Sequence, residues 1–222
     1  MASSFAGFTK EAFSFYEGLE DDNSKAYWLS HKATFDVNVK GAMEAFLASL
    51  PESYHPFHVF RPNRDVRFAK DKSPYKTMHG ASSETDGGSI RYTHVAAGGL
   101  LVAAGQYMMQ NDQIARARAA IDDDTTGKEL VKLVAALVKT GYQVGPGGNP
   151  PLKTTPKGYP ADHPRIELLR WKGLIASTDI TNKTVLTSPK VRDEAMAFWK
   201  ASLPLLHWLD TNVGPTTVVY QR

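Results

Sequence analysis

The chain has 222 residues, of which 42% are hydrophobic and 22% charged, the balance of an ordinary globular protein. It contains no cysteine, which excludes disulfides, thiolate metal sites, iron–sulfur clusters and a cysteine nucleophile. The net charge of +3 is too small to indicate nucleic-acid binding by the chain as a whole. We find no signal peptide and no apolar run long enough to span a membrane, and we therefore expect a soluble, cytoplasmic protein.

The N-terminal part of the sequence predicts helices. Thr9 can cap a first helix, and Ser24 can cap a second one, because both precede runs of apolar residues at helical spacing. Residues 36–41 are weaker helix formers, so we expect a bend or a break there. Pro51 ends the helical region.

Strands are expected next. Residues 57–60 can form a short strand, and residues 81–88 read as a turn-rich, mobile segment. Residues 90–97 and 100–108 read as two strands, joined at Gly98-Gly99, a dipeptide that favours a tight hairpin. A glycine inside the second of these strands, Gly105, suggests the close approach of a helix or a ligand.

The second half of the sequence predicts further helices and one more strand. One helix begins at Asn111 or Asp112, and another runs from about Thr126 to Gly141, with Asp124 as its cap.

Near the C-terminus, a short helix is expected from Pro164 and a strand over 174–180. A last helix starts at Ser188-Pro189 and is kinked at Pro204.

This order of elements does not alternate between strands and helices. It predicts an α+β fold, in which helices pack on a small, mainly antiparallel sheet. We expect residues 1–222 to form a single compact domain, and the only candidate boundary is the loop at 145–151.

The most charged stretch of the chain is RDVRFAKDKSPYK, residues 64–76. Residues 60–80 carry six cations and two carboxylates, a local charge of +4. Its candidate ligand-binding residues are Arg64, Arg67, Lys70, Lys72, Tyr75 and Lys76, because arginine and lysine donate hydrogen bonds to phosphate or carboxylate.

A plainer interpretation of this stretch has about equal weight. Val66 and Phe68 would anchor a loop, while Asp65 and Asp71 pair with nearby cations. Exposed pairs of that kind add only about 0–1 kcal/mol, so stability alone is a weak reason for so many charges.

A second basic segment, PLKTTPKGYPADHP, begins at residue 151. Lys153 and Lys157 stand among prolines, which stiffen the loop that presents them. His163 can act as an acid or base near neutral pH, or it can cap the helix that begins at Pro164. We favour the capping role or another hydrogen-bonding role within the protein.

Other motifs of known chemistry are missing from the sequence. It contains no phosphate-binding Walker loop, no dinucleotide-binding glycine pattern, no HExxH and no G-x-S-x-G. His55 and His58 have no third ligand at suitable spacing, and the aspartates of 122–124 fit a helix cap better than a cation site. We therefore predict no metal and no cofactor.

Five segments together resemble a known family. They are FAGFTKEAFSFYEGLEDDNSKAYWLSHKATF, RDVRFAKDKSPYKT, GGLLVAAGQYM, LKTTPKGYPADHPRIELLRWKGL and a final amphipathic helix. In this order they resemble the bacterial conserved-hypothetical proteins grouped as domain of unknown function 2461. One departure is Asp22-Asn23, where the family usually has a double asparagine. The resemblance implies one full-length domain, and it implies no activity, cofactor or catalytic residue.

These observations lead to one main hypothesis about function. The two basic segments would bind an anionic, phosphorylated small molecule, with Lys153 and Lys157 completing the first loop. An alternative is an enzyme acting on a phosphoester or a similar anion, with Asp65 or His163 as general base. Nucleic-acid binding has weaker support, and a structural or interaction protein is a further alternative. The sequence does not indicate an oligomeric state.

Overall fold

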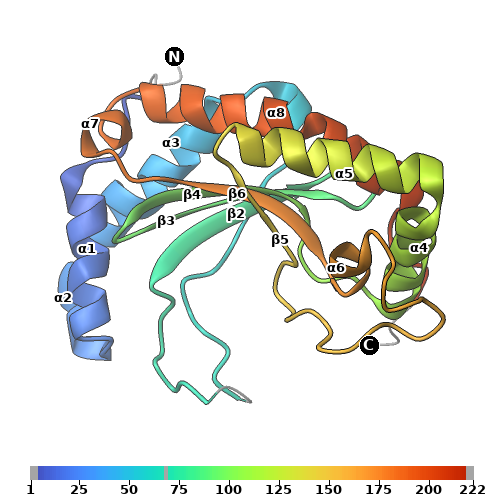
Figure 1. Ribbon diagram of the computed structural model, residues 1–222. Coiled ribbons are helices and arrows are strands. Elements are labelled where there is room, and N and C mark those ends of the chain that lie inside the picture. Colours follow the sequence, from blue (N-terminus) through green and yellow to red (C-terminus); the bar gives the residue numbers. More distant parts are fainter. Residues whose placement is uncertain (1–4, 68–69, 219–222) are drawn as a thin grey trace. The chain divides into compact units, whose positions relative to one another are not determined.

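The computed structural model describes residues 5–67 and 70–218 (Figure 1). The helical elements are α1 Lys10–Asp21, α2 Lys25–Thr34, η1 Phe35–Gly41, α3 Ala42–Ala48, η2 Glu52–Tyr54, α4 Asn111–Asp122, α5 Asp124–Lys139, α6 Ile166–Leu169, α7 Lys183–Leu186 and α8 Lys190–Asn212. The strands are β1 His58–Val59, β2 Met78–Glu84, β3 Ile90–Ala96, β4 Gly99–Gln106, β5 Gln143–Gly145 and β6 Leu174–Ile180. They form an antiparallel sheet in the order β1-β2-β3-β4-β6-β5, which confirms the expected α+β class.

The chain divides into two compact units that interleave along the sequence. Unit 1 contains residues 1–83, 92–102 and 179–197, and unit 2 contains residues 84–91, 103–178 and 198–222. The loop at 145–151 lies inside unit 2, so it does not mark a boundary between the units.

The N-terminal helices of unit 1 follow the sequence closely. Ser24 caps α2 as expected, because its hydroxyl accepts a hydrogen bond from the N–H of Tyr27 at 3.1 Å. The segment expected to bend is the π-helix η1, and its wider turns keep α2 and α3 continuous while they bury Phe35 and Val39.

Aromatic side chains form much of the core of unit 1. Phe5 and Phe8 pack against Phe46, with ring centroids 5.3 and 5.7 Å away. Trp28 contacts Phe15 and lies 4.7 Å from the ring of Phe35. Large buried rings supply most of the hydrophobic free energy of such a core, so α1, α2, η1 and α3 form a firm support for the rest of the unit.

The sequence prediction for residues 81–88 was wrong in its first half. Residues 81–84 belong to β2, which pairs with β1 through His58↔Ser82 and Val59↔Ala81. Small and polar residues have low strand propensity, but pairing with a neighbouring strand overrides it. Only the stretch after β2 turns, and there the hydroxyl of Thr85 donates to Asp210 at 3.0 Å.

In unit 2, the two helices expected after the strands are present as α4 and α5. The cap of α5 is Asp123, one residue before the expected Asp124, because Oδ1 of Asp123 accepts from the N–H groups of Thr125 and Thr126. The helix ends two residues before Gly141, whose φ of +90° suits glycine.

The close approach expected at Gly105 is made by a neighbouring strand. A Cβ at Gly105 would lie 2.1 Å from the carbonyl oxygen of Leu174 in β6, and the residue has a φ of +138°. The indole groups of Trp199 and Trp208 donate to the carbonyls of Ala103 and Thr126 at 3.1 and 3.0 Å. These bonds satisfy the polar atom of each buried indole.

The C-terminal half of the chain contains the predicted elements and two short additional ones. Helix α6 and strand β6 lie where the sequence places them, and α8 continues through Pro204. The short elements β5 and α7 were not predicted. No helix in the described ranges is both long and apolar enough to cross a membrane.

Candidate functional site

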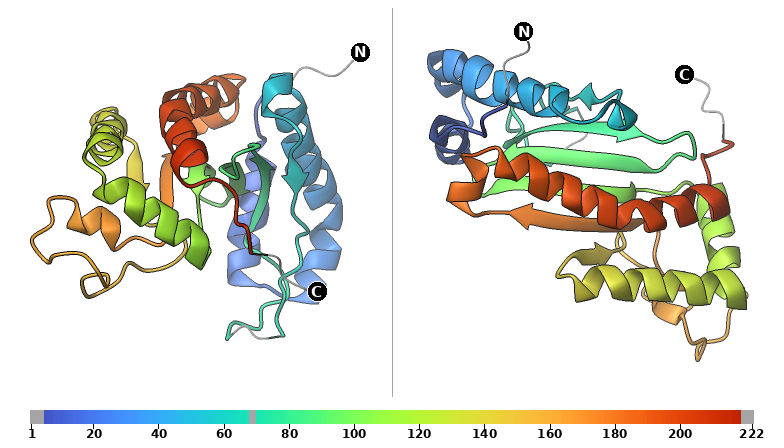
Figure 2. Two further views of the ribbon diagram at one scale, coloured as in Figure 1. Left: turned by 90° about the vertical axis from the view of Figure 1, so that its right-hand side faces the viewer. Right: turned by 90° about the horizontal axis from the view of Figure 1, so that it is seen from above.

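The charged loop connects β1 to β2 and projects beyond these strands (Figures 1 and 2). At its base two short segments pair: the N–H of Arg64 donates to Pro74, and that of Lys76 donates to Pro62, both at 2.9 Å. Asn63 and Tyr75 form an antiparallel bridge between them. The backbone therefore places positions 61, 64 and 76 at one end of the loop.

Tyr75 anchors this loop to the helices of unit 1. Its buried ring stacks on Trp28, with a centroid distance of 4.2 Å and an interplanar angle of 9°. The side chain of Asn23 accepts from the N–H of Tyr75 and donates to its carbonyl, both at 3.1 Å. Tyr75 was expected to offer a hydroxyl or a ring to a ligand, and the structure uses the ring within the protein.

Asn23 connects two of the segments that carry the family resemblance. It belongs to the Asp22-Asn23 pair that departs from the family pattern, and it bonds a residue 52 positions away. This contact was not predicted, because the residues near Asn23 in the sequence do not indicate that Tyr75 is its partner.

The aspartates of the loop pair with local cations, as the plainer interpretation expected. Arg67 donates to both carboxylate oxygens of Asp65, at 3.0 and 2.7 Å, and Arg64 forms an ion pair with Asp71. The ammonium of Lys72 donates to the carbonyl of Val66 at 2.9 Å. Phe68, the other expected anchor, lies outside the described residues.

Three cations remain together at the base of the loop. Burial lowers the pKa of Lys76, and the positive charges of Arg61 and Arg64 lower it further. The ammonium of Lys76 donates to the carbonyl of Arg61 at 3.1 Å and lies 5.6 Å from the ring centroid of Phe60. Nε of Arg64 is buried and has no hydrogen-bond partner among the described residues. The base of the loop is therefore electropositive.

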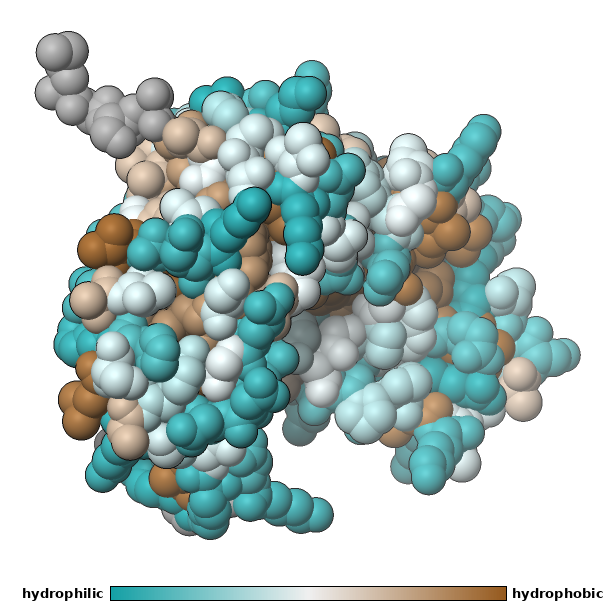
Figure 3. Space-filling model, turned by 90° about the vertical axis from the view of Figure 1, so that its left-hand side faces the viewer, coloured by the Kyte–Doolittle hydropathy of each residue, from teal (hydrophilic) through white to brown (hydrophobic). Residues whose placement is uncertain are grey.

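The other cations of the loop are more exposed than Arg64 and Lys76. Lys70 and Lys72 are exposed, and 76% of the side-chain surface of Arg67 is accessible. In Figure 3 the lower part of the face shown, toward the end of the loop, is mainly hydrophilic. These side chains can reach an anion in solution, but Arg67 must first leave Asp65.

The surroundings of Asp65 argue against its use as a general base. The side chain and N–H of Arg67 hold the pKa of Asp65 at about 2. A general base works best when its pKa lies near the operating pH, and this carboxylate is far below neutral.

His163 forms hydrogen bonds within the protein, but it does not cap α6, because the N-cap residue of that helix is Arg165. Its Nδ1 accepts from the N–H of Arg165 at 3.0 Å, and its Nε2 lies 3.2 Å from the carboxylate of Asp122. Only 8% of its side-chain surface is exposed. Both ring nitrogens are thus occupied within the protein.

The second basic loop presents its lysines to solvent. Lys153 and Lys157 are exposed in unit 2, whereas the charged loop of residues 61–76 belongs to unit 1. That the two loops share one ligand stays a prediction.

His79 is a buried histidine beside the charged loop that was not among the candidate site residues. It is 3% exposed, and neither ring nitrogen has a hydrogen-bond partner among the described residues. Burial, with the charges of Lys40 and Lys76, lowers the pKa of His79 to about 4. This imidazole is therefore neutral at physiological pH, and the charges of Lys40 and Lys76 add to the positive field beside it.

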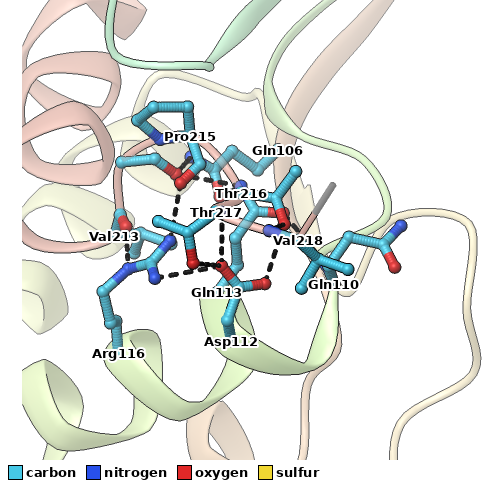
Figure 4. A network of polar contacts seen from close by, with 11 residues as sticks. Gln106, Gln110, Asp112, Gln113, Arg116, Val213, Pro215, Thr216, Thr217 and Val218 are labelled. Carbon is cyan, nitrogen blue, oxygen red and sulfur yellow. Dashed lines mark hydrogen bonds and ion pairs between the residues drawn. The ribbon is translucent and has the colours of Figure 1, made fainter. Parts of the chain in front are cut away.

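The main polar network of unit 2 holds the segment after α8 (Figure 4). Asp112 accepts from the hydroxyl of Thr216 at 2.9 Å and from the N–H of Thr217 at 2.8 Å. Arg116 donates to the carbonyls of Val213 and Pro215 and pairs with Asp112. The hydrogen bonds of Asp112 and Arg116 described here join parts of the protein to each other, so we assign this network a structural role.

This network predicts a pH-dependent contribution to stability. Hydrogen bonds from the N–H of Thr217, and then from Thr216 and Arg116, hold the pKa of Asp112 below its ordinary value. A lowered pKa stabilises the fold above the ordinary carboxyl range near pH 4, and this contribution is lost as the pH falls below that range. Asp112→Asn should lower the thermal midpoint at pH 7, and the difference from the wild type should shrink toward pH 3. Equal midpoints at pH 7 would contradict this role, and Asp193→Asn is the exposed control.

No group of three or more His, Asp or Glu side chains in residues 5–67 and 70–218 is arranged to hold a metal ion.

The protein therefore has an α+β fold, and the base of its charged loop is electropositive. The family model for "Conserved hypothetical protein (DUF2461)" matches residues 11–208, and the chain belongs to this family. No curated protein and no solved structure matches the chain.

Proposed function

We propose that the protein binds an anionic, phosphorylated ligand at the base of the charged loop, through Arg61, Arg64 and Lys76. One observation carries the proposal: burial and two neighbouring arginines lower the pKa of Lys76. Repulsion between these like charges raises the free energy of the unbound protein, and an anion that pairs with them removes this repulsion. Asp71 pairs with Arg64, and the carboxylate of Asp65, which is held by Arg67, has only a weaker electrostatic interaction with Arg61.

The geometry of the site suits a phosphate. Arginine and lysine donate several charge-assisted hydrogen bonds to phosphate oxygens. The Tyr75–Trp28 stack and the Asn23 bonds fix the backbone around Lys76 before any ligand arrives, which limits the entropy lost on binding. Lys70 and Lys72 add positive charge that attracts the ligand from solution.

The test measures pyrophosphate binding by calorimetry at low ionic strength. Arg61→Ala/Lys76→Ala should weaken binding by about a hundredfold or more, since two charge-assisted bonds are lost and each contributes about 1.5–3 kcal/mol. The control, Lys132→Ala/Lys200→Ala, removes the same charge from exposed positions on α5 and α8. Equal affinities for the two double variants would overturn the proposal, because binding would then depend on net charge alone.

Lys153→Ala/Lys157→Ala tests whether the second basic loop takes part. If both loops hold one ligand, this variant should also weaken pyrophosphate binding severalfold relative to Lys132→Ala/Lys200→Ala. An unchanged affinity would restrict the site to the first loop.

A further inference from the structure

A strip of aromatic side chains lies on one face of the strands in unit 1. Side chains alternate along β3, so Thr93 and Val95 are buried while Tyr92 and His94 lie on the opposite face and are only partly buried. Gly80 in β2 leaves room for this pair, because a Cβ there would lie 3.1 Å from both the Tyr92 hydroxyl and Cβ of His94.

Ring contacts connect the strip across the strands. The ring of Phe60 lies 6.2 Å from that of Tyr92 and 5.5 Å from that of His58. Tyr92 and His94 are 5.5 Å apart, and the Tyr92 hydroxyl lies 3.1 Å from Nδ1 of His94. Phe60, Tyr92 and His94 are thus partly buried side chains in mutual contact, and polar atoms lie at the Tyr92–His94 end.

The strip adjoins the cationic cluster of the charged loop. The ammonium of Lys76 lies 5.6 Å from the centroid of the Phe60 ring, and the same ammonium donates to the backbone carbonyl of Arg61. One small molecule can therefore place an anionic group at Lys76 and a flat group along the rings.

We propose that the strip of Phe60, Tyr92 and His94 binds a planar aromatic base carried by the phosphorylated ligand, which makes the ligand class a nucleoside monophosphate. This inference rests on the proposed function, since Arg61 and Lys76 hold the phosphate. Bases stack on aromatic side chains with little regard to their identity, and the neighbouring positive charge complements the phosphate. The Tyr92 hydroxyl contacts Nδ1 of His94 and Sδ of Met78, so a polar edge of the base would bind by joining or replacing these contacts.

His94 is suited to neutral hydrogen bonding. Burial lowers the pKa of His94, and the carboxylate of Asp179 opposes this shift in part. The imidazole then offers one donor and one acceptor at neutral pH. Asp179 is the anionic group at this end of the strip, so the phosphate is expected at the Lys76 end.

The test compares adenosine monophosphate, ribose phosphate and inorganic phosphate as probes of the wild-type protein. Adenosine monophosphate should bind about tenfold or more tightly than ribose phosphate, because only the former carries a base that can stack. In Tyr92→Leu this ratio should fall toward one. Tyr107→Leu, which removes an exposed tyrosine in unit 2, should retain the ratio.

Each other outcome overturns a definite part of the proposal. Equal affinities of the wild type for adenosine monophosphate and ribose phosphate would overturn the base site and leave the proposed function standing. A ratio that survives in Tyr92→Leu would show that the base binds elsewhere. If no phosphate compound binds the wild type, the proposed function fails and this inference fails with it. The wild-type comparison decides the matter even if Tyr92→Leu does not fold.

Discussion

Arg165→Ala is expected to lower the free energy of unfolding by about 1.5–3 kcal/mol or more, because it removes the hydrogen bonds of a buried charged group. The guanidinium donates to the carbonyls of Ile121 and Asp122, at 2.6 and 2.7 Å, and to the carboxylate of Asp124 at 3.1 Å. Only 5% of its side-chain surface is exposed. Truncation leaves the C-terminal carbonyls of α4 buried without these donors, and urea unfolding monitored by circular dichroism measures the loss.

Two further variants make this prediction specific. Arg165→Lys keeps the charge but not the planar fork, so its loss should be intermediate. Arg192→Ala removes an exposed arginine paired with its neighbour Asp193 and should cost less than about 1 kcal/mol. If Arg165→Ala costs no more than Arg192→Ala, the buried guanidinium does not stabilise the end of α4.

Arg165 separates the roles of the two basic segments. Both are rich in cations and both carry the family resemblance, so the sequence suggested one shared purpose. In the second segment, His163 bonds to Arg165, the residue that follows the segment, and Arg165 in turn bonds to the end of α4. Lys153 and Lys157 of the same segment remain exposed. At the base of the first loop, Arg61, Arg64 and Lys76 lie close together, and the two arginines lower the pKa of Lys76. The number of charges in each segment did not indicate which cations bond to the protein and which lie close to other cations.

The sequence predicted those elements whose signal is local and long. The apolar periodicity of α1, α4, α5 and α8 was sufficient to place these helices, and the glycine pair placed β3 and β4 to within two residues. The hairpin turn lies at residues 97–98, one residue before the predicted Gly98-Gly99, and Gly99 begins β4. Strand β2 was missed because its serines and glycine favour turns, and its pairing with β1 shows that it is a strand. The elements β5 and α7 have three and four residues, too few for a periodic pattern.

The candidate site was predictable to a similar degree. The pairing of Asp65 with Arg67 follows from alternation along an extended chain, so it could be expected. The bonds between Asn23 and Tyr75, and the positions of His79, Tyr92 and His94 beside the loop, depend on contacts between distant segments. A single sequence carries no signal for such contacts.

Tyr75→Ala should cost about 3–5 kcal/mol of unfolding free energy, the range for large aromatic side chains truncated in a core. It removes a ring that stacks 4.2 Å from Trp28 and is 8% exposed. Because Arg64 donates to Pro74 and Lys76 follows Tyr75, the loss should also disorder the base of the loop. We therefore expect pyrophosphate to bind Tyr75→Ala at least tenfold more weakly, at a temperature where the variant remains folded.

Tyr75→Phe separates the ring from the hydroxyl. It keeps the stack on Trp28 and the backbone bonds to Asn23, so stability and pyrophosphate affinity should stay close to those of the wild type. A strong loss of affinity in Tyr75→Phe, with stability retained, would return the hydroxyl to the ligand site. Wild-type affinity in folded Tyr75→Ala would show that the cations need no anchored loop, because flexible lysine and arginine side chains can then find the phosphate without a fixed backbone.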